Sequence, residues 1–223
     1  MKNLPDFAPR LRAAASALRL DIDVNQQNCL LAYLDQLQRW NRTYNLTAIR
    51  DPEGMLIQHL FDSLAVVQPI KKELYKHTVR PTVVDVGSGA GLPGVVLAIM
   101  CSGATVHCVD AVEKKATFIR HISGALKLPD LQAHHARIET LPPLQADVVI
   151  SRAFASLADF ARLSGRHVRP GGRLVAMKGK EPLEEIEALQ TETAWRVERI
   201  EPLQVPELEA QRCLVWLIEQ GSA

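Results

Sequence analysis

The chain has 223 residues, of which 47% are apolar and 23% are charged, and its formal net charge is +1. These proportions are those of an ordinary globular protein, and the near-neutral total excludes a chain that is basic along its whole length. Any nucleic-acid site must therefore come from a local patch of basic residues.

Neither a membrane segment nor a metal site is expected. No apolar run approaches the ~20 residues that a helix needs to cross a bilayer, and the N-terminus lacks an apolar signal segment. The four cysteines contain no C-x-x-C pair, and Cys101 and Cys108 fall in apolar runs, so they resemble small buried side chains in a reducing compartment. We expect a cytoplasmic protein with no metal and no membrane partner.

The first 50 residues predict two helices. One covers residues 8–19, and the other follows a polar break at residues 21–25; both carry apolar residues at helical spacing. The second ends in residues 39–47, where two arginines, two asparagines and two aromatic residues lie close together. This segment is either a capped helix end or a loop that faces nucleic acid, and the residues leave both interpretations open. On the second interpretation, Asn45 is a candidate substrate-binding residue.

A further helix is predicted to begin at Asp51 and Pro52, as N-cap and first helical residue. The polar residues His59, Asp62 and Ser63 lie on or beside its apolar face, and we interpret them as a hydrogen-bonded contact between the helix and the rest of the protein. Residues 71–80 are interpreted as a solvated basic linker. Residues 1–80 are thus predicted to be a helical extension packed on an α/β domain of residues 81–220.

The stretch TVVDVGSGAGLPG, residues 82–94, predicts a buried strand followed by a glycine loop and a helix over residues 95–101. Such an arrangement opens a nucleotide-type site, because missing side chains allow the backbone to approach a ligand. The pattern G-x-G-x-x-G is present but is by itself a weak signal for a dinucleotide. An NAD-dependent oxidoreductase, or a nucleotide-binding protein without activity, is therefore the alternative interpretation.

Three residues favour S-adenosylmethionine (SAM) as the ligand. Asp85 places a carboxylate before the loop, where it would attract an ammonium group and repel a pyrophosphate. Pro93 removes an N–H donor that a phosphate would use. Asp110 ends the next strand and could accept both hydroxyls of a ribose.

Strands and helices alternate after residue 82. Further strands are predicted at residues 105–109, 131–136, 147–150 and 174–177, with helices at 113–126, 157–168 and 181–193 and a turn at 170–172. Two last strands, at 196–200 and 213–218, have no helix between them and are expected to be antiparallel. A Rossmann-like, mostly parallel sheet with a C-terminal antiparallel hairpin is typical of class I SAM-dependent methyltransferases, which is the fold class we predict.

Local charge and strand ends indicate where the chemistry lies. Six basic residues and no acidic one fall between Arg162 and Lys180, so a phosphate-binding surface is expected there. Ligands of parallel sheets bind outside the carboxyl ends of the strands. Asp85, Asp110, Arg152 and Lys178 are all predicted to lie at that edge, and Lys178 is a second candidate for substrate binding.

The strand over residues 147–150 ends in Ser151-Arg152-Ala153-Phe154, which contains neither the Asn/Asp-Pro-Pro-aromatic segment of amine methylation nor a cysteine nucleophile. Arg152 is a poor base but a two-pronged donor, suited to the O6 side of guanine or to a phosphate. Guanine N7 carries a free lone pair and needs no deprotonation. A site with an arginine and no evident base is consistent with that acceptor, and Arg152 is the candidate catalytic residue.

The chain resembles, over essentially its whole length, the bacterial small-subunit rRNA guanine-N7 methyltransferase family (RsmG, also called glucose-inhibited division protein B). The resemblance rests on RWN at residues 39–41, NLT at 45–47, HLFDSL at 59–64, DVGSGAGLPG at 85–94, ISRAF at 150–154 and KG at 178–179. Ala90 departs from the proline of many members. The resemblance implies methylation of one guanine of 16S rRNA near the decoding region, either in the RNA or in the small ribosomal subunit. It also implies SAM contacts at Gly87, Leu92, Ile138, Glu139 and Arg152.

Overall fold

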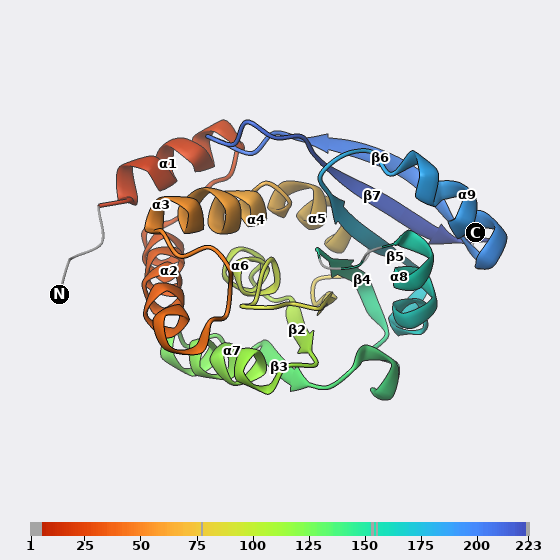
Figure 1. Cartoon of the computed structure of the whole chain (residues 1–223), viewed down its shortest axis with the longest axis horizontal. Coiled ribbons are helices and arrows are strands. Elements are labelled where there is room, and N and C mark those ends of the chain that lie inside the picture. The colour runs from red at the N-terminus through yellow and green to blue at the C-terminus, as the bar shows by residue number, and fades with distance from the viewer. Residues whose placement is uncertain (1–5, 77, 153, 155, 222–223) are drawn as a thin grey trace.

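The computed structural model describes residues 6–76, 78–152, 154 and 156–221. Within these residues the strands form one seven-stranded sheet, in the order β3-β2-β1-β4-β5-β7-β6 (Figure 1). The bounds are β1 Thr82–Val86, β2 Thr105–Asp110, β3 Leu131–His135, β4 Ala146–Ser151, β5 Val168–Lys178, β6 Trp195–Leu203 and β7 Arg212–Glu219.

Strands β1 to β5 pair in parallel, whereas β7 pairs antiparallel with both β5 and β6. The predicted mixed sheet with a C-terminal antiparallel hairpin is therefore confirmed. Because β7 runs in the opposite direction, its first residues lie beside the last residues of β5, and Cys213 pairs with Lys178. The carboxyl edge of the parallel strands thus includes the start of β7.

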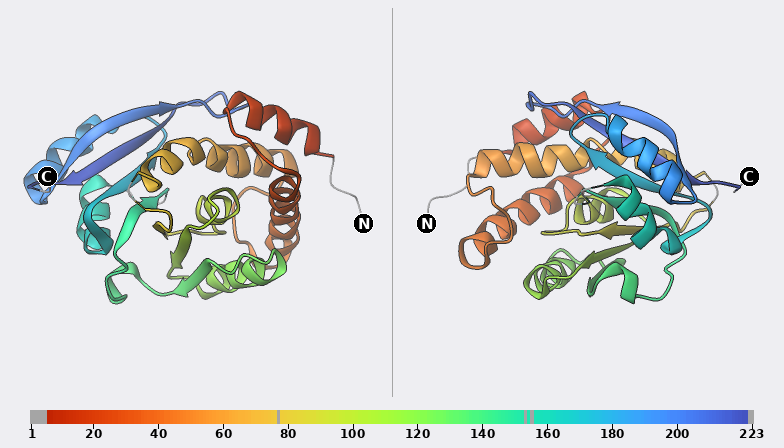
Figure 2. Two further views of the ribbon diagram at one scale, coloured as in Figure 1. Left: turned by 180° about the vertical axis from the view of Figure 1, so that it is seen from behind. Right: turned by 45° about the vertical axis from the view of Figure 1, so that its right-hand side comes forward.

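Helices cover both faces of the sheet (Figures 1 and 2). One face packs against α8 (Leu157–Ser164) and α9 (Leu183–Glu192), which contribute Phe160 and Leu189 to its apolar core. The other face packs against the helices before β1 and against α6 and α7. Successive residues of β1 enter different cores, since Val83 belongs to one and Val84 to the other. This burial on both faces accounts for the valine run that predicts the strand.

The helices of the second face are α1 Ala8–Ala17, α2 Val24–Tyr44, α3 Pro52–Met55, the π-helix η1 Leu56–Phe61, α4 Asp62–Leu64, α5 Val67–Leu74, α6 Gly94–Met100 and α7 Glu113–Ala125. Asp23 begins α2 with a capping box, in which Asp23 accepts from the N–H of Gln26 while the Gln26 side chain accepts from the N–H of Asp23. Short 3₁₀ segments, η2 Ile138–Thr140 and η3 Gly165–His167, precede β4 and β5. No helix in the described ranges is both long and apolar enough to span a membrane.

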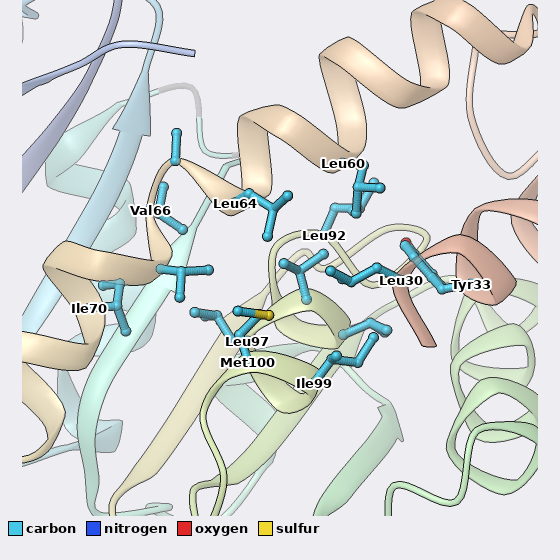
Figure 3. Close-up of a cluster of buried hydrophobic side chains, with 14 of the residues drawn as sticks. Leu30, Tyr33, Leu60, Leu64, Val66, Ile70, Leu92, Leu97, Ile99 and Met100 are labelled. Carbon is cyan, nitrogen blue, oxygen red and sulfur yellow. The ribbon is translucent and has the colours of Figure 1, made fainter. Parts of the chain in front are cut away.

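The N-terminal helices share one apolar core with the glycine loop and α6. Figure 3 shows Leu30 and Tyr33 of α2 beside Leu60, Leu92 and Leu97. The Tyr33 hydroxyl donates a hydrogen bond of 2.8 Å to the carbonyl of Ala90, in the loop itself. We therefore propose that residues 1–80 are a helical extension that folds together with the α/β domain of residues 81–220.

The expected linker at residues 71–80 is only partly a linker. Helix α5 continues to Leu74, and Val67, Ile70 and Leu74 are buried at helical spacing. The prediction was wrong because the lysines at 71 and 72 suggested solvent, while the apolar residues on the opposite side of the same turns were overlooked.

The predicted turn at residues 170–172 is an irregularity inside β5, which runs from Val168 to Lys178. Gly171 has a φ of 77°, and a Cβ atom on Gly172 would lie 2.9 Å from the carbonyl oxygens of Ala146 and Asp147. The glycines therefore allow β5 to approach β4 closely while its register shifts. The helix predicted at residues 157–168 ends at Ser164, because the 3₁₀ turn η3 follows it at Gly165–His167 and β5 begins at Val168.

The helix predicted from Pro52 onward is confirmed, but its middle has π-helical geometry. Asp51 caps it by accepting a 2.6 Å hydrogen bond from the N–H of Gly54. The π segment then runs from Leu56 to Phe61 and is followed directly by Asp62. Segments of this kind are frequent at functional sites, and this one carries His59 and Asp62 toward the carboxyl edge of the sheet.

Candidate functional site

Two cavities formed by described residues lie at the carboxyl edge of the sheet. The first, here the glycine-loop cavity, has a volume of about 260 Å³ and is lined by Val86, Gly87, Val109, Asp110, Ala111, Ala136, Arg137, Ile138, Glu139, Phe154 and Leu163. The second, here the arginine cavity, has a volume of about 380 Å³ and is lined by Ile49, Gln58, His59, Asp62, Arg152, Met177, Lys178, Gly179 and Arg212.

The glycine loop is held open by backbone hydrogen bonds. The N–H groups of Gly87 and Ser88 both donate to the carbonyl of Val109, at 2.9 and 3.1 Å. Gly87 and Gly89 have φ values of 67° and 59°, in the left-handed region that glycine adopts readily. A Cβ atom built on Gly89 would meet nothing within 4 Å, so the space in front of this residue is open to a ligand.

Asp110 stands at the mouth of this cavity with a fixed orientation. Its Oδ2 accepts from the N–H of Gly89 at 2.9 Å, and its Oδ1 accepts from the N–H of Val112 at 2.8 Å. A carboxylate has about four acceptor positions, and Nζ of Lys115 lies 3.7 Å from Oδ2, so at most two positions are left for hydroxyl groups of a ligand. The geometry is compatible with the ribose role that the sequence suggests.

Ile138 and Glu139 complete the opposite wall through the short helix η2. The Ile138 side chain is buried, whereas Glu139 is exposed at the rim. Nε2 of His167 donates to the Ile138 carbonyl at 3.0 Å, which fixes the segment to the sheet. Arg137 also lines this wall and was not a sequence candidate.

Asp85 does not line either cavity in this structure. It is completely buried, and its Oδ2 accepts a 2.7 Å hydrogen bond from the N–H of Gly94. A Cβ atom on Gly94 would lie 2.8 Å from this oxygen and 2.4 Å from Sγ of Cys108, so only glycine fits there. Burial raises the pKa of Asp85 to about 7, and its Oδ1 has no hydrogen-bond partner among the described residues.

The side chain of Leu92 is also outside the cavities, because it is packed in the core between α2 and α6 (Figure 3). A cofactor contact at this position has to use the backbone. A role for Asp85 likewise requires a bridging water or a movement of the loop. The cofactor roles of both residues stay predictions.

The arginine cavity is organised around Asp62, which is 3% exposed. Its Oδ2 accepts a 3.3 Å hydrogen bond from Nη1 of Arg152, and its Oδ1 accepts a 2.9 Å bond from Nε of Arg212. Nη1 of Arg152 also donates to the carbonyl of Gln58 at 3.2 Å. Three elements therefore meet here: the helix that follows the π segment, the end of β4 and the start of β7.

His59 lies in the same cavity and is held by Thr47. Its Nε2 lies 2.8 Å from Oγ1 of Thr47, and the N–H of Thr47 donates to Oδ1 of Asn41. Burial and the nearby charge of Arg152 lower the pKa of His59 to about 4, so the imidazole is neutral at physiological pH.

Residues 39–47 have a clear structural role. Asn45 ends α2 in a left-handed conformation, with φ of 47°, and lines neither cavity. Asn41 is buried and also donates to the carbonyl of Ile49, while Trp40 packs against Tyr44 and Phe118. The capping interpretation is confirmed for this segment, and the RNA contact at Asn45 stays a prediction.

Lys178 lies at the wall of the arginine cavity, as its position at a strand end predicts. Its Nζ is 2.9 Å from both carboxylate oxygens of Glu185. Other members of the basic cluster at residues 162–180 are paired as well: Arg162 with Asp159 and Glu192, Arg169 with Asp147, and Arg173 with Glu198. These pairs weaken the argument for a phosphate-binding surface there, and the RNA contact at Lys178 stays a prediction.

The sequence candidates thus separate into two groups. Gly87, Asp110, Ile138 and Glu139 meet in the glycine-loop cavity, whereas Arg152 and Lys178 meet in the arginine cavity. Ala153, part of the motif after β4, lies outside the described residues. No cluster of three or more metal-ligating side chains occurs in the part of the chain that the structure describes.

Sequence reasoning missed Arg212 and interpreted Asp62 as a structural contact. A signal for Arg212 was present, because an antiparallel final strand must begin at the carboxyl edge of its parallel neighbours. No local pattern links Asp62 to either arginine, since the partners are 90 and 150 residues away in the chain.

The chain is similar to known proteins over nearly its whole length. The sequence model of a family described as GidB, rRNA small subunit methyltransferase G, matches residues 26–215. Proteins named ribosomal RNA small subunit methyltransferase G from Bordetella pertussis and Bordetella avium are 63% and 64% identical, and each alignment covers 97% of both chains. The protein of that name from Methylibium petroleiphilum is 49% identical, with 96% of both chains covered.

Solved structures show the same fold at low sequence identity. A SAM-dependent methyltransferase from Aquifex aeolicus is 18% identical, with a TM-score of 0.56 over 84% of this chain and 97% of that one. A SAM-dependent methyltransferase from Thiobacillus denitrificans, in complex with S-adenosyl-L-homocysteine, is 12% identical, with a TM-score of 0.51 over 69% of this chain and 90% of that one. The class I methyltransferase fold predicted from the sequence is confirmed.

Proposed function

The chain belongs to the rRNA small subunit methyltransferase G family, and from this premise we propose that it transfers the methyl group of SAM to N7 of one guanine in 16S rRNA near the decoding region. Family membership decides between methyl transfer and the NAD-dependent oxidoreductase that the glycine pattern alone leaves open. The cofactor is SAM, which supplies an electrophilic methyl group when it is bound.

The glycine-loop cavity fits part of this cofactor. Its volume of about 260 Å³ is below the ~300–1,000 Å³ of most small-molecule sites, so it accommodates one portion of SAM and not the whole molecule. We propose that the adenosine portion lies there, with the ribose hydroxyls on Asp110 and the adenine ring against Ile138 and near Glu139. Oδ1 of Asp85 has no hydrogen-bond partner among the described residues, which supports an ammonium group near it, reached through a bridging water or a movement of the loop because Asp85 lines neither cavity.

We propose guanine N7 as the acceptor because the described residues of the arginine cavity offer donors and no available base. Asp62 is engaged on both oxygens by arginines, and His59 has a pKa of about 4, which makes it a weak base. An acceptor that must lose a proton would need a base of higher pKa within hydrogen-bond reach. Guanine N7 needs none, so the contribution of Arg152 is to orient the base or a phosphate beside it.

We propose that the protein acts in the cytoplasm, on free 16S rRNA, on an assembly intermediate or on the whole small subunit. The test is methyl transfer from labelled SAM to each of these three substrates, followed by mapping of the modified base and atom. We expect N7-methylguanine at a single position near the decoding region. A methyl group on another atom, or on several unrelated guanines, would refute the proposed acceptor.

Ligand-induced stabilisation provides an independent check on the cofactor. SAM or S-adenosylhomocysteine should raise the melting temperature, because a ligand that binds only the folded state stabilises it. NAD at the same concentration should have no effect. Stabilisation by NAD alone would contradict the assignment of the glycine-loop cavity.

A further inference from the structure

Asp62 is the only described side chain that contacts both arginines of the arginine cavity. We propose that Asp62 is a positioning residue for methyl transfer, which holds the guanidinium groups of Arg152 and Arg212 in fixed orientations so that both can contact the same acceptor nucleotide. This inference rests on the proposed function, because it concerns the acceptor side of that reaction.

The hydrogen bonds leave one side of each guanidinium available. In Arg152, Nη1 is bonded to Asp62 and Gln58, and in Arg212, Nε is bonded to Asp62 and Nη1 to the carbonyl of Gln211. For Nη2 of either arginine no acceptor occurs among the described residues. Both side chains line the arginine cavity, so a ligand there can reach their guanidinium groups, and Arg212 also lines a neighbouring cavity beside Gly179 and Gln211.

Because Asp62 is buried, its charged carboxylate lowers the stability of the folded protein unless a positive group is paired with it. A carboxylate that is 3% exposed loses most of its hydration, and the arginine charges compensate for that loss. A neutral residue would fill the same space at lower cost if the contact served packing alone. The carboxylate of Asp62 instead orients the two guanidinium groups. Without this contact, each long arginine side chain could adopt many rotamers.

The π-helix that precedes Asp62 positions its side chain near Arg152. The segment Leu56–Phe61 ends directly before it, and the carbonyl of Gln58, within that segment, accepts from the same Nη1 of Arg152. One helical stretch therefore supplies two acceptors for the same nitrogen, Nη1 of Arg152, which fixes the position of this end of the guanidinium. Irregular helical geometry of this type is common where a helix contributes to a functional site.

Asp147 offers a matched comparison at the opposite edge of the sheet. It is also buried, its Oδ1 accepts from Nε of Arg169 at 2.6 Å, and its Oδ2 accepts from the N–H of Thr82 at 2.7 Å. It lines neither the glycine-loop cavity nor the arginine cavity. A substitution at Asp147 therefore measures the structural cost of losing a buried aspartate that pairs with an arginine.

The experiment compares Asp62→Asn with Asp147→Asn in the full-length protein. Asparagine keeps the shape but turns an N–H₂ group toward one arginine, so one of the two guanidinium contacts is lost. We expect the single-turnover methylation rate, at saturating SAM and RNA, to fall about 100-fold in Asp62→Asn, as for other small misplacements of reacting groups. In Asp147→Asn the rate should change less than about threefold, while both variants bind SAM with wild-type affinity in calorimetry.

A double-mutant cycle separates positioning from a general structural role. If Asp62 acts through Arg152, Asp62→Asn should cost much less in an Arg152→Ala background than in the wild type. Asp62→Glu is the second variant, because it keeps the charge that the arginines require but lengthens the side chain. It should fold with a lower melting temperature, because the added methylene has to be accommodated at a buried site, and it should lose about tenfold or more in rate at a temperature where it is fully folded.

Three results would overturn the inference: a wild-type rate in Asp62→Glu, equal losses in Asp62→Asn and Asp147→Asn, or fully additive losses in the cycle. Each of these is observed with an active wild-type enzyme, so each leaves the proposed function intact. A wild-type protein that does not methylate small-subunit rRNA in any form would instead overturn the proposed function, and the inference with it.

Discussion

The glycine-loop cavity and the arginine cavity lie at the same edge of one sheet but are built in different ways. The first depends on the backbone of the glycine loop: Gly87, which lines it, and the neighbouring Gly89 adopt left-handed conformations, and backbone N–H groups fix Asp110. The second is formed by side chains from distant parts of the chain, and Asp62 and Arg212 are 150 residues apart.

This difference determines which kind of substitution impairs the function of each cavity. A site made of backbone is damaged when a side chain is added, because the added atoms occupy ligand space. A site made of side chains is damaged when a functional group is removed, because its partners lose their orientation. Substitutions in the first cavity should therefore affect cofactor affinity, and substitutions in the second should affect the rate of methyl transfer.

The largest effect is expected for Arg152→Ala. Loss of the guanidinium should lower the single-turnover methylation rate by about 10²- to 10³-fold, because the acceptor is no longer oriented. Of the two cavities, Arg152 lines the arginine cavity, so affinity for SAM, measured by calorimetry, should fall much less than the rate. The SAM contact of Arg152 that the family resemblance implies stays a prediction, and this measurement tests it. Arg152→Lys should recover little of the rate, because an ammonium group cannot reproduce a planar two-pronged contact.

Arg199→Ala is the matched control for this prediction. Like Arg152, which pairs with Asp62, Arg199 forms ion pairs with carboxylates, those of Glu73 and Glu198. It lines neither cavity. It should lose stability without a comparable loss of rate. A large loss of SAM affinity in Arg152→Ala with an unchanged rate would mean that the two cavities do not have separate roles.

An intermediate effect is expected for Gly89→Ala in the glycine loop, beside the glycine-loop cavity: Gly89 does not line this cavity, but its N–H donates to Asp110, which does. The new methyl group meets nothing in the free protein but enters the open space where the ligand approaches. Affinity for SAM should fall roughly 10- to 100-fold, which corresponds to about 1.4–2.8 kcal/mol. The rate at saturating SAM should remain within a few-fold of wild type.

Gly171→Ala controls for backbone strain in this comparison. Gly171 also has a positive φ, of 77°, and lies in β5 away from both cavities. Both variants should lose about 1 kcal/mol of stability, the cost of a left-handed conformation in alanine. Equal SAM affinity in the two variants would show that the glycine loop does not contact the cofactor.

The smallest effect concerns pH and Asp85. The folded pKa of about 7 lies above the ordinary value of about 4, so the folded protein binds this proton more tightly than the unfolded chain does between these values. Protonated Asp85 therefore contributes to the free energy of unfolding below about pH 4, and this contribution is lost as the pH rises to about 7. SAM carries an ammonium group, so its affinity should rise about three- to tenfold between pH 6 and pH 8, and Asp85→Asn should abolish this rise.

The arginine cavity should show no such dependence. His59 is already neutral because its pKa is about 4, and the proposed acceptor loses no proton. The single-turnover rate at saturating SAM and RNA should vary less than about threefold between pH 6.5 and 8.5. A rate that rises tenfold per pH unit would indicate an acceptor that must ionise and would exclude guanine N7.

The sequence by itself determined the fold class and placed Gly87 and Asp110 at the first cavity, although Asp85 and Leu92, also expected there, lie outside it. The valine run, the glycine cluster and the alternation of strands and helices are local patterns, and each reflects a backbone requirement within a few residues. Gly87 and Asp110 could be assigned in this way because a parallel strand end and its following loop always lie at the ligand-binding edge. The same reasoning failed at α5 and at the irregularity in β5, where burial of one helix face and close approach of two strands depend on neighbouring elements.

Only the tertiary structure decided which side chains join Arg152 and Lys178 in the second cavity. His59 and Asp62 were visible as polar residues on an apolar helix, but the sequence does not encode which side chains they will meet. The π segment before Asp62, the end of β4 and the start of β7 converge because one hydrophobic core packs the N-terminal helices against the sheet. Packing of this kind depends on many contacts far apart in the chain, so no local pattern predicts the Asp62–Arg152–Arg212 cluster.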